Sequence, residues 1–282
     1  MKGLRRWFRV LWDAFDGFNV NDGSAMAGFI AFSALLSLFP FLIFAATLTG
    51  ILLGETRSDS VIEALFEIAP EHVALTLEPV VEEVLSKRSG EVLSLSALFA
   101  IWVASNAVEA LRIAFDRAYQ VPDPRNFFQN RALAIGLVFL GAVVAALLGF
   151  SILLSPLILR IAQETAHLRL PVVAGYLSYG LGVLVFIGFV FVMHRTLPGR
   201  QPAGGRLWPG VLTTTILWVV FATGFSIYLS YTPTYTVTYG TLAGVIVTLM
   251  FFYLTGATII YGAEVNAALN RFESRERGAG MR

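Results

Sequence analysis

The stretch that decides the fold lies near the C-terminus and reads Tyr239-Gly-Thr-Leu-Ala-Gly244-Val-Ile-Val-Thr-Leu-Met-Phe-Phe-Tyr-Leu-Thr-Gly-Ala-Thr-Ile-Ile-Tyr-Gly-Ala-Glu264-Val-Asn266. About 20 apolar residues are enough for a helix to cross the hydrocarbon of a bilayer. The stretch ends in a carboxylate, Glu264, and a carboxylate is stable inside a membrane protein only when it is paired or faces the interior. It therefore predicts a membrane-spanning helix whose last turns carry a paired polar group.

The composition places the whole chain in the membrane class. Of 282 residues, 56% are hydrophobic and only 14% are charged. The absence of cysteine excludes disulfides, a thiol nucleophile and thiolate metal sites. The three histidines, His72, His167 and His194, have no metal-ligand spacing, so neither a metal nor another cofactor is expected. A net charge of +1 gives no reason to expect a nucleic-acid partner.

Six apolar segments separated by polar ones predict an all-α polytopic membrane protein. The predicted spans are residues 25–54, 92–108, 132–159, 171–193, 207–229 and 240–263. They form one transmembrane domain over 23–270, between an N-terminal segment, 1–22, and a tail, 271–282. The N-terminal segment is amphipathic, and two interpretations stay open: an interfacial helix on an anionic leaflet, or a segment packed on the protein's own cytoplasmic face.

The segment 55–91 differs from the rest of the chain because it holds nine acidic and three basic residues. Two apolar stripes broken near Pro70 predict a pair of amphipathic helices, which form a helical insertion after the first span. A charge run of this kind is typical of a solvated face, and a protein partner is the alternative role.

Prolines and small residues mark packing features. Pro40 cannot donate to the carbonyl of Leu36, so we expect a kink, with Ser37 or a neighbouring helix satisfying that carbonyl. Such a kink either lines a transport path or only helps packing. Pro156 should bend or end the third span. Small residues at four-residue spacing predict close helix packing at Gly141, Gly149, Gly240 and Gly244.

A polar cluster follows the second span, which continues without a break to Tyr119. Helical spacing places Asn106, Glu109, Arg112 and Asp116 on overlapping faces, with neighbouring charges in ion-pair range. The cluster is either a gate or headgroup site, or an anchor for the helix at the membrane edge. We expect Glu264 to be paired inside the bundle, with Arg112 as a candidate partner. The candidate substrate path or intramembrane polar network thus comprises Ser37, Pro40, Asn106, Glu109, Arg112, Asp116, Glu264 and Asn266.

Lysine and arginine counts predict the orientation. Fifteen lie in the N-terminal segment, the loops 109–131 and 194–206 and the tail, and five lie in the intervening loops. By the positive-inside rule both termini are cytoplasmic, and the insertion 55–91 is extracytoplasmic.

Three blocks of sequence carry a family resemblance. They are Asp22 to Pro40, Ile101 to Asn106 with its continuation Ala110 to Tyr119, and Tyr239 to Asn266. In this order they resemble the YihY/BrkB family of bacterial inner-membrane proteins over nearly the whole chain. The chain departs from the expected pattern at Met250-Phe-Phe-Tyr253, where a tryptophan is expected, and at Asp116, where an asparagine is expected.

The resemblance implies a six-helix protein of the bacterial cytoplasmic (inner) membrane whose suspected role is transport or export of a lipid or lipid-linked molecule. The family has also carried a ribonuclease BN label and a virulence label. We therefore expect a transporter or exporter of a lipid or envelope component, not an enzyme, in contact with membrane lipids. It lacks the Gly-x-x-x-x-Gly-Lys-Ser/Thr loop of an ATPase. The alternative is a non-transporting envelope scaffold that binds a partner at 55–91; a ribonuclease is disfavoured because the acids are scattered. The oligomeric state is left open.

The predicted orientation is testable because the chain has no native cysteine. A membrane-impermeant maleimide should label Ser58→Cys in intact cells, and should label Ser274→Cys only after permeabilisation. The opposite pattern would overturn the orientation.

Overall fold

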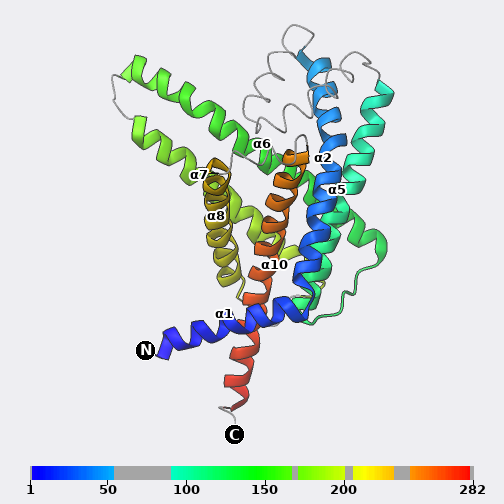
Figure 1. Cartoon of the computed structure of the whole chain (residues 1–282), viewed down its shortest axis with the longest axis vertical. Coiled ribbons are helices and arrows are strands. Elements are labelled where there is room, and N and C mark those ends of the chain that lie inside the picture. The colour runs from blue at the N-terminus through cyan, green and yellow to red at the C-terminus, as the bar shows by residue number, and fades with distance from the viewer. Residues whose placement is uncertain (1, 54–89, 167–170, 201–205, 232–241, 280–282) are drawn as a thin grey trace. The chain divides into compact units, whose positions relative to one another are not determined.

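The computed structural model describes residues 2–53, 90–166, 171–200, 206–231 and 242–279, and these residues form α-helices without a strand. The helices are shown in Figure 1. Their bounds are α1 Lys2–Val20, α2 Gly23–Leu53, α5 Gly90–Tyr119, α6 Phe127–Ala166, α7 Pro171–Thr196, α8 Trp208–Tyr231 and α10 Leu242–Ala279. The prediction of an all-α chain is confirmed for this part of the sequence.

Several of these helices are long and apolar enough to cross a membrane. Within the described residues there are four such segments, Ala97–Tyr119, Phe127–Ala145, Trp208–Tyr231 and Ala243–Arg275. Two shorter apolar helical segments are Gly23–Leu38 and Gly180–Thr196. The chain is therefore a multi-pass membrane protein by the length and composition of its helices.

The helix ends differ from the predictions at two places. Helix α6 continues through Pro156 to Ala166, so Pro156 does not end this helix, and the alternative that it bends the helix stays a prediction. A proline removes one backbone hydrogen bond, and helices of membrane proteins tolerate that loss. Helix α10 extends beyond residue 263 to Ala279 and takes in most of the predicted tail. The insertion 55–91 lies almost wholly outside the described residues, as do Gly240 and the surroundings of Gly149.

The chain divides into two compact units. The first comprises residues 1–21, 115–217 and 259–282, and the second comprises residues 22–114 and 218–258. Helices α5, α8 and α10 each contribute residues to both units.

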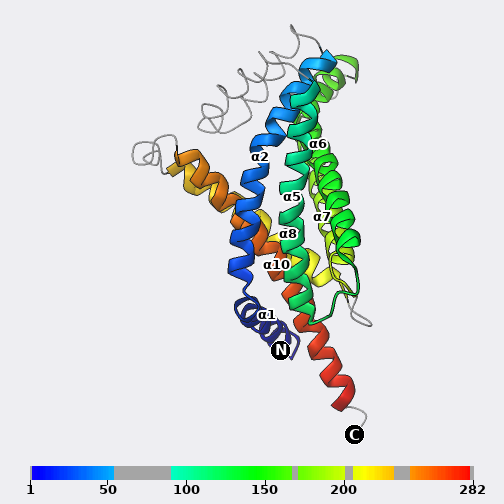
Figure 2. The ribbon, with the colours of Figure 1, turned by 90° about the vertical axis from the view of Figure 1, so that its right-hand side faces the viewer.

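In the first unit, α1 crosses the C-terminal part of α10 (Figures 1 and 2). Val10 and Ala14 of α1 are buried together with Val265, Ala268 and Leu269 of α10. Arg6 extends this contact: it pairs with Glu273 at 3.3 Å, and its guanidinium lies 5.1 Å from the Phe272 ring centroid.

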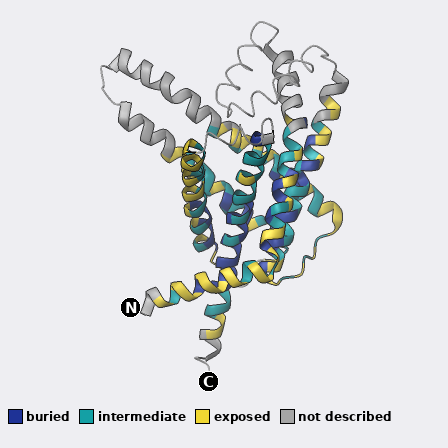
Figure 3. Cartoon of the chain, in the orientation of Figure 1, coloured by how far each residue is buried: buried dark blue, intermediate teal, exposed yellow. Residues whose placement is uncertain are grey.

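Helix α1 also carries large apolar side chains that are exposed. Figure 3 shows much of this helix in the colour of exposed residues. Phe8 is 69% exposed and Trp12 is 63% exposed, and Trp7 and Phe15 are also exposed. Large aromatic side chains in this number are typical of a helix that contacts a lipid surface on one side.

Glycines allow α8 and α10 to approach closely within the first unit. A Cβ added at Gly262 would run into the Thr214 hydroxyl and lie 2.7 Å from the Gly210 carbonyl oxygen. A Cβ at Gly210 would likewise run into the Gly262 carbonyl. Helices α6 and α7 also run side by side in this unit (Figure 2). At Gly141 of α6 an added Cβ would lie 3.5 Å from Phe189 of α7, an ordinary contact.

In the second unit, α2 packs on the N-terminal part of α10. A Cβ at Gly256 would lie 3.3 Å from Ile30, and the Ser24 and Tyr253 hydroxyls are 2.7 Å apart. Small residues therefore mediate contacts of α10 in both units, at Gly256 and Gly262. Close packing at Gly240 and Gly244 stays a prediction.

Gly262→Ala should destabilise the protein by about 1–3 kcal/mol, because the new methyl group meets the backbone of α8. Gly188→Ala is the matched control on α7, where an added Cβ meets nothing within 4 Å. It should be neutral or stabilising by up to about 1 kcal/mol, the helix-propensity difference between the two residues. Thermal unfolding in detergent measures both, and equal stability of the two variants would contradict the close approach.

Candidate functional site

Glu264 is a buried carboxylate of the first unit. It lies on α10 and is 0% exposed. Its Oε1 accepts a hydrogen bond of 2.6 Å from the Asn21 side-chain amide. Its Oε2 accepts no hydrogen bond within the described residues and lies 3.9 Å from the Arg271 guanidinium. The carboxylate is therefore buried between one neutral donor and one cation.

The end of α1 is shaped to cover this carboxylate. At Gly17 there is no side chain, and an added Cβ would run into Glu264 Oε2. Helix α1 ends at Val20, and Asp22, with φ of 58°, turns the chain directly into α2. The sequence predicts that the residues around Asn21 cap a helix, but the Asn21 side chain binds Glu264 instead.

Asn266 lies two residues further along α10 and has a different role. Its Oδ1 accepts a 2.7 Å bond from the Gly210 N–H, and its Nδ2 donates to the Leu207 carbonyl at 3.0 Å. The first N–H groups of a helix lack partners within that helix, and Gly210 is the third residue of α8. The buried Asn266 amide thus caps the N-terminus of α8 and fixes it to α10.

His194 adds a further buried polar side chain at the end of α7. It is 0% exposed, its Nδ1 lies 2.9 Å from the Val190 carbonyl oxygen, and its ring meets Phe115 edge-on at 5.0 Å. Within the described residues, no group of three or more His, Cys, Asp or Glu side chains could hold a metal ion. The imidazole packs among helix ends.

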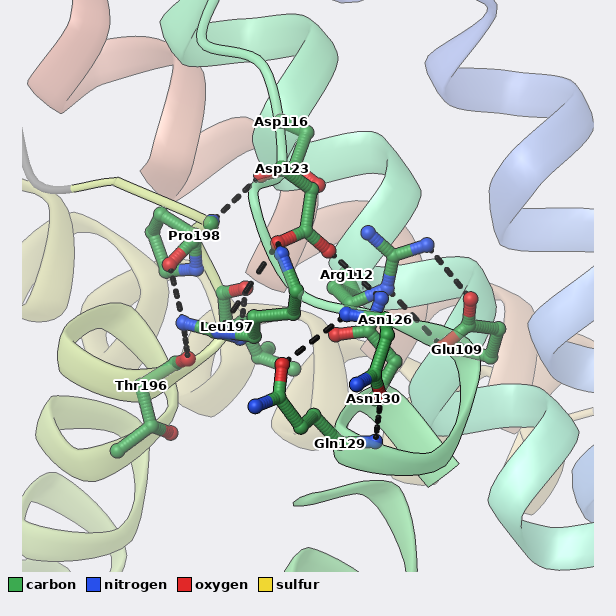
Figure 4. A network of polar contacts seen from close by, with 12 residues as sticks. Glu109, Arg112, Asp116, Asp123, Asn126, Gln129, Asn130, Thr196, Leu197 and Pro198 are labelled. Atoms are coloured by element: carbon green, nitrogen blue, oxygen red, sulfur yellow. Dashed lines mark hydrogen bonds and ion pairs between the residues drawn. The ribbon is translucent and has the colours of Figure 1, made fainter. Parts of the chain in front are cut away.

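A second polar network joins the loop 120–126 to the segment after α7, as Figure 4 shows. The Arg125 guanidinium donates to the carbonyls of Thr196, Leu197 and Pro198 at 3.0, 3.4 and 2.7 Å. Asp123 accepts from the Arg125 backbone N–H at 3.0 Å. A planar guanidinium has five N–H donors, so one side chain can satisfy several loop carbonyls.

Asp116 belongs to this second network. Its carboxylate accepts a 2.7 Å bond from the Gly199 N–H. Next to it, Asn126 and Gln129 form a reciprocal capping box at the start of α6, with distances of 3.0 and 2.9 Å. Asp116 therefore holds a loop in place, which favours the anchoring interpretation of this residue.

The other predicted candidates lie in the second unit. Glu109 accepts two hydrogen bonds from Arg112, of 3.0 and 2.6 Å, so the expected ion pair is present. The Ser37 hydroxyl donates to the Ala34 carbonyl at 2.8 Å and not to Leu36, while α2 continues through a buried Pro40. Asn106 is half-buried on α5. That all eight candidates form one path stays a prediction.

Sequence reasoning missed three functional partners. Asn21 lies in the predicted N-terminal segment 1–22, Arg125 in the loop 109–131 and Arg271 in the predicted tail 271–282, and none of the three is among the predicted site residues. The signal for Arg271 was its spacing, since it follows Glu264 by seven residues and thus two helical turns. No comparable local signal marks Asn21 or Arg125, because their partners are distant in sequence.

The fold and these contacts define a class: a multi-pass helical membrane protein with buried polar side chains. Comparison of sequences makes the assignment specific, because the family described as "Virulence factor BrkB" matches residues 14–282. The chain belongs to this family, as the resemblance implied.

Individual relatives agree with this assignment. YfkH of Bacillus subtilis (strain 168), whose name calls it ribonuclease-like, is 32% identical over 92% of this chain and 94% of its own length. A UPF0761 membrane protein of Pseudoalteromonas translucida (strain TAC 125) is 24% identical over 86% of this chain and 80% of its own length. A UPF0761 membrane protein of Vibrio parahaemolyticus is 27% identical over 92% of this chain and 79% of its own length. No solved structure matches the chain.

Asn266→Leu should destabilise the protein by about 1–3 kcal/mol, because it leaves the buried Gly210 N–H without a partner. The Leu207 carbonyl keeps its bond from Val211 at 3.1 Å, so one orphaned group is expected. Thr213→Val on α8 is the control, because it removes only a hydroxyl bonded to the Pro209 carbonyl. Thermal unfolding in detergent should show a large decrease of the unfolding temperature for Asn266→Leu and a small one for Thr213→Val. Equal decreases would contradict the proposed cap.

Proposed function

We propose that this protein moves or exports a lipid or another envelope component across the bacterial cytoplasmic membrane, without an ATPase of its own. The observation that carries the proposal is the fully buried Glu264 carboxylate on the long apolar helix α10. Ionisable groups in membrane helices are rare, and they commonly mark substrate or ion paths.

The proposed topology has six spans with both termini in the cytoplasm. The four long apolar segments and the two shorter ones support six spans, since they coincide with the six predicted segments. The distribution of lysine and arginine supports the orientation. In this topology Glu264 lies at the cytoplasmic end of the predicted span 240–263, and α10 continues beyond it to Ala279.

The contacts of Glu264 support a role beyond anchoring. A solvated anchor would be exposed to water, whereas this side chain is 0% exposed and its Oε2 accepts no hydrogen bond within the described residues. Its neutral donor, Asn21, follows α1, the helix with exposed aromatic side chains. A change at the carboxylate can therefore reach the helix that contacts the lipid surface.

Glu264→Gln tests the proposal in vesicles. The purified protein should accelerate transbilayer movement of fluorescently labelled phosphatidylethanolamine or phosphatidylglycerol. Glu264→Gln should slow this movement about tenfold or more, because it removes a charge-assisted contact worth about 1.5–3 kcal/mol. The fold is checked by the unfolding curve.

Glu273→Gln is the matched control for this assay. Glu273 is also on α10 and also pairs with arginines, Arg6 at 3.3 Å and Arg206 at 3.8 Å. It should move lipid at the wild-type rate. Wild-type vesicles that move no lipid faster than protein-free vesicles would reject lipid movement, and an active Glu264→Gln variant would reject the role of the carboxylate.

A scaffold role is the second candidate, favoured by the nine acidic residues of the segment 55–91. Deletion of residues 58–88 should then abolish capture of an extracytoplasmic partner, while wild-type vesicles remain inactive. The ribonuclease-like name of one relative makes RNA cleavage worth assaying. Cleavage that depends on Glu109 or Asp116 would favour that third function.

A further inference from the structure

A pocket of about 420 Å³ opens in the first unit beside the end of α5 and the last turns of α10. Its lining residues on α10 recur at intervals of three and four, so they share one face of the helix. The lining comprises Tyr119, Gln120, Ala267, Asn270, Arg271, Ser274 and Arg275. Six of these seven side chains are polar, two are cationic and none is acidic.

The pocket contains hydrogen-bond donors that are unpaired or poorly paired. Asn270 Nδ2 is buried without a hydrogen-bond partner within the described residues, and the buried Tyr119 hydroxyl interacts with the Asn266 side chain only in poor hydrogen-bond geometry. Buried donors are almost always paired in native proteins, so each unpaired one calls for an explanation. The Ser274 hydroxyl is already engaged, because it donates to the Asn270 carbonyl at 2.9 Å. The donors that line the pocket therefore require a ligand with acceptor oxygens.

The charges of the pocket favour an anion. Arg271 donates to the Ala118 carbonyl at 3.2 Å and lies 3.9 Å from Glu264, so part of its charge is compensated. Arg275 is exposed at the pocket, and it contributes a second guanidinium. One net positive charge remains among Glu264, Arg271 and Arg275, which suits a singly charged group with several oxygens.

The backbone conformation of Gln120 also favours a ligand site at this pocket. Gln120 has φ of 55°, and the bonds Gln120 N–H to Arg117 and Val121 N–H to Asp116, of 3.2 and 3.1 Å, form a Schellman motif that ends α5. This position usually holds glycine, because other residues are strained there. A glutamine in place of glycine adds an amide to the pocket wall, and strained residues of this kind cluster at ligand sites.

We propose that this pocket binds a phosphate group, supplied by an anionic phospholipid headgroup or by a soluble phosphate. The guanidinium of Arg275, the amide of Asn270 and the hydroxyl of Tyr119 donate hydrogen bonds to the phosphate oxygens, and Arg271 connects the phosphate to Glu264.

The neighbouring face of α10 contacts α1 at Tyr261, Val265 and Leu269. The pocket thus lies within about two turns of the helix with exposed aromatic residues, the level at which lipid phosphates are found. The inference does not require that the protein transports anything.

Isothermal titration of the full-length protein in dodecyl maltoside, which contains no phosphate, tests the proposal. Dihexanoyl phosphatidylglycerol and inorganic phosphate are titrated separately, and neutral dihexanoylglycerol is the phosphate-free probe. The test variants are Arg275→Gln and Asn270→Leu. Arg9→Gln is the control, because it removes the same charge from an exposed position on α1.

At least one phosphate-bearing probe should bind the wild type, with affinity reduced about tenfold or more in both test variants and unchanged in Arg9→Gln. Binding of the phospholipid alone assigns the site to a headgroup, and binding of phosphate that displaces the phospholipid assigns it to the phosphate itself. The proposal is overturned if neither phosphate-bearing probe binds, if dihexanoylglycerol binds equally well, or if all three variants bind as the wild type does.

Arg275 is exposed, so its variant decides alone if Asn270→Leu does not fold. The titration contains no transport step. A failure to bind phosphate therefore does not bear on the proposed lipid movement, which the vesicle assay of Glu264→Gln tests. Inactive vesicles likewise do not bear on the proposed phosphate site, which the titration tests.

Discussion

Burial of the Glu264 carboxylate is the constraint on which the arrangement of the first unit depends. A carboxylate removed from water needs donors or cations around it, since its desolvation is otherwise prohibitive. The chain provides Arg271 two turns further along α10, and Asn21 from just after α1. Gly17 leaves the space into which the carboxylate fits. The buried charge thus fixes the end of α1 to α10, in addition to the apolar contact of Val10 and Ala14 and the pair of Arg6 and Glu273.

Helix α10 performs several tasks with residues that are close in sequence. Gly256 and Gly262 allow other helices to approach its backbone, and Asn266 caps α8 through two hydrogen bonds. Small residues give close packing where hydrocarbon gives no hydrophobic drive between helices. The polar residues then follow within one or two turns, so packing and polar chemistry are concentrated on the same segment.

Much of this arrangement could be predicted from the sequence, because apolar runs longer than a bilayer is thick are unambiguous. The helical character of the chain and the unbroken helix from the second span to Tyr119 follow from such runs, and the pair of Glu109 and Arg112 follows from helical spacing. Long-range partners could not be predicted in the same way. Asn21 and Glu264 are 243 positions apart, and Arg125 bonds to carbonyls about 70 positions away. Local patterns carry no information about such pairs. The local rule that proline bends or ends a helix does not fix which of the two occurs at Pro156, and α6 continues through it to Ala166.

The contact between α1 and α10 also has a consequence for biosynthesis. Ribosomes make α1 before α10, and the side chains that bury Val10 and Ala14 lie far along the chain, at residues 265–269. Until those residues are made, this face of the amphipathic α1 lacks its partner on α10, and contacts so distant in sequence form slowly. The leaflet surface can cover apolar side chains of an amphipathic helix in that interval. The order of synthesis therefore favours a sequence in which α1 first adsorbs to the membrane and only later receives α10 against its inner side.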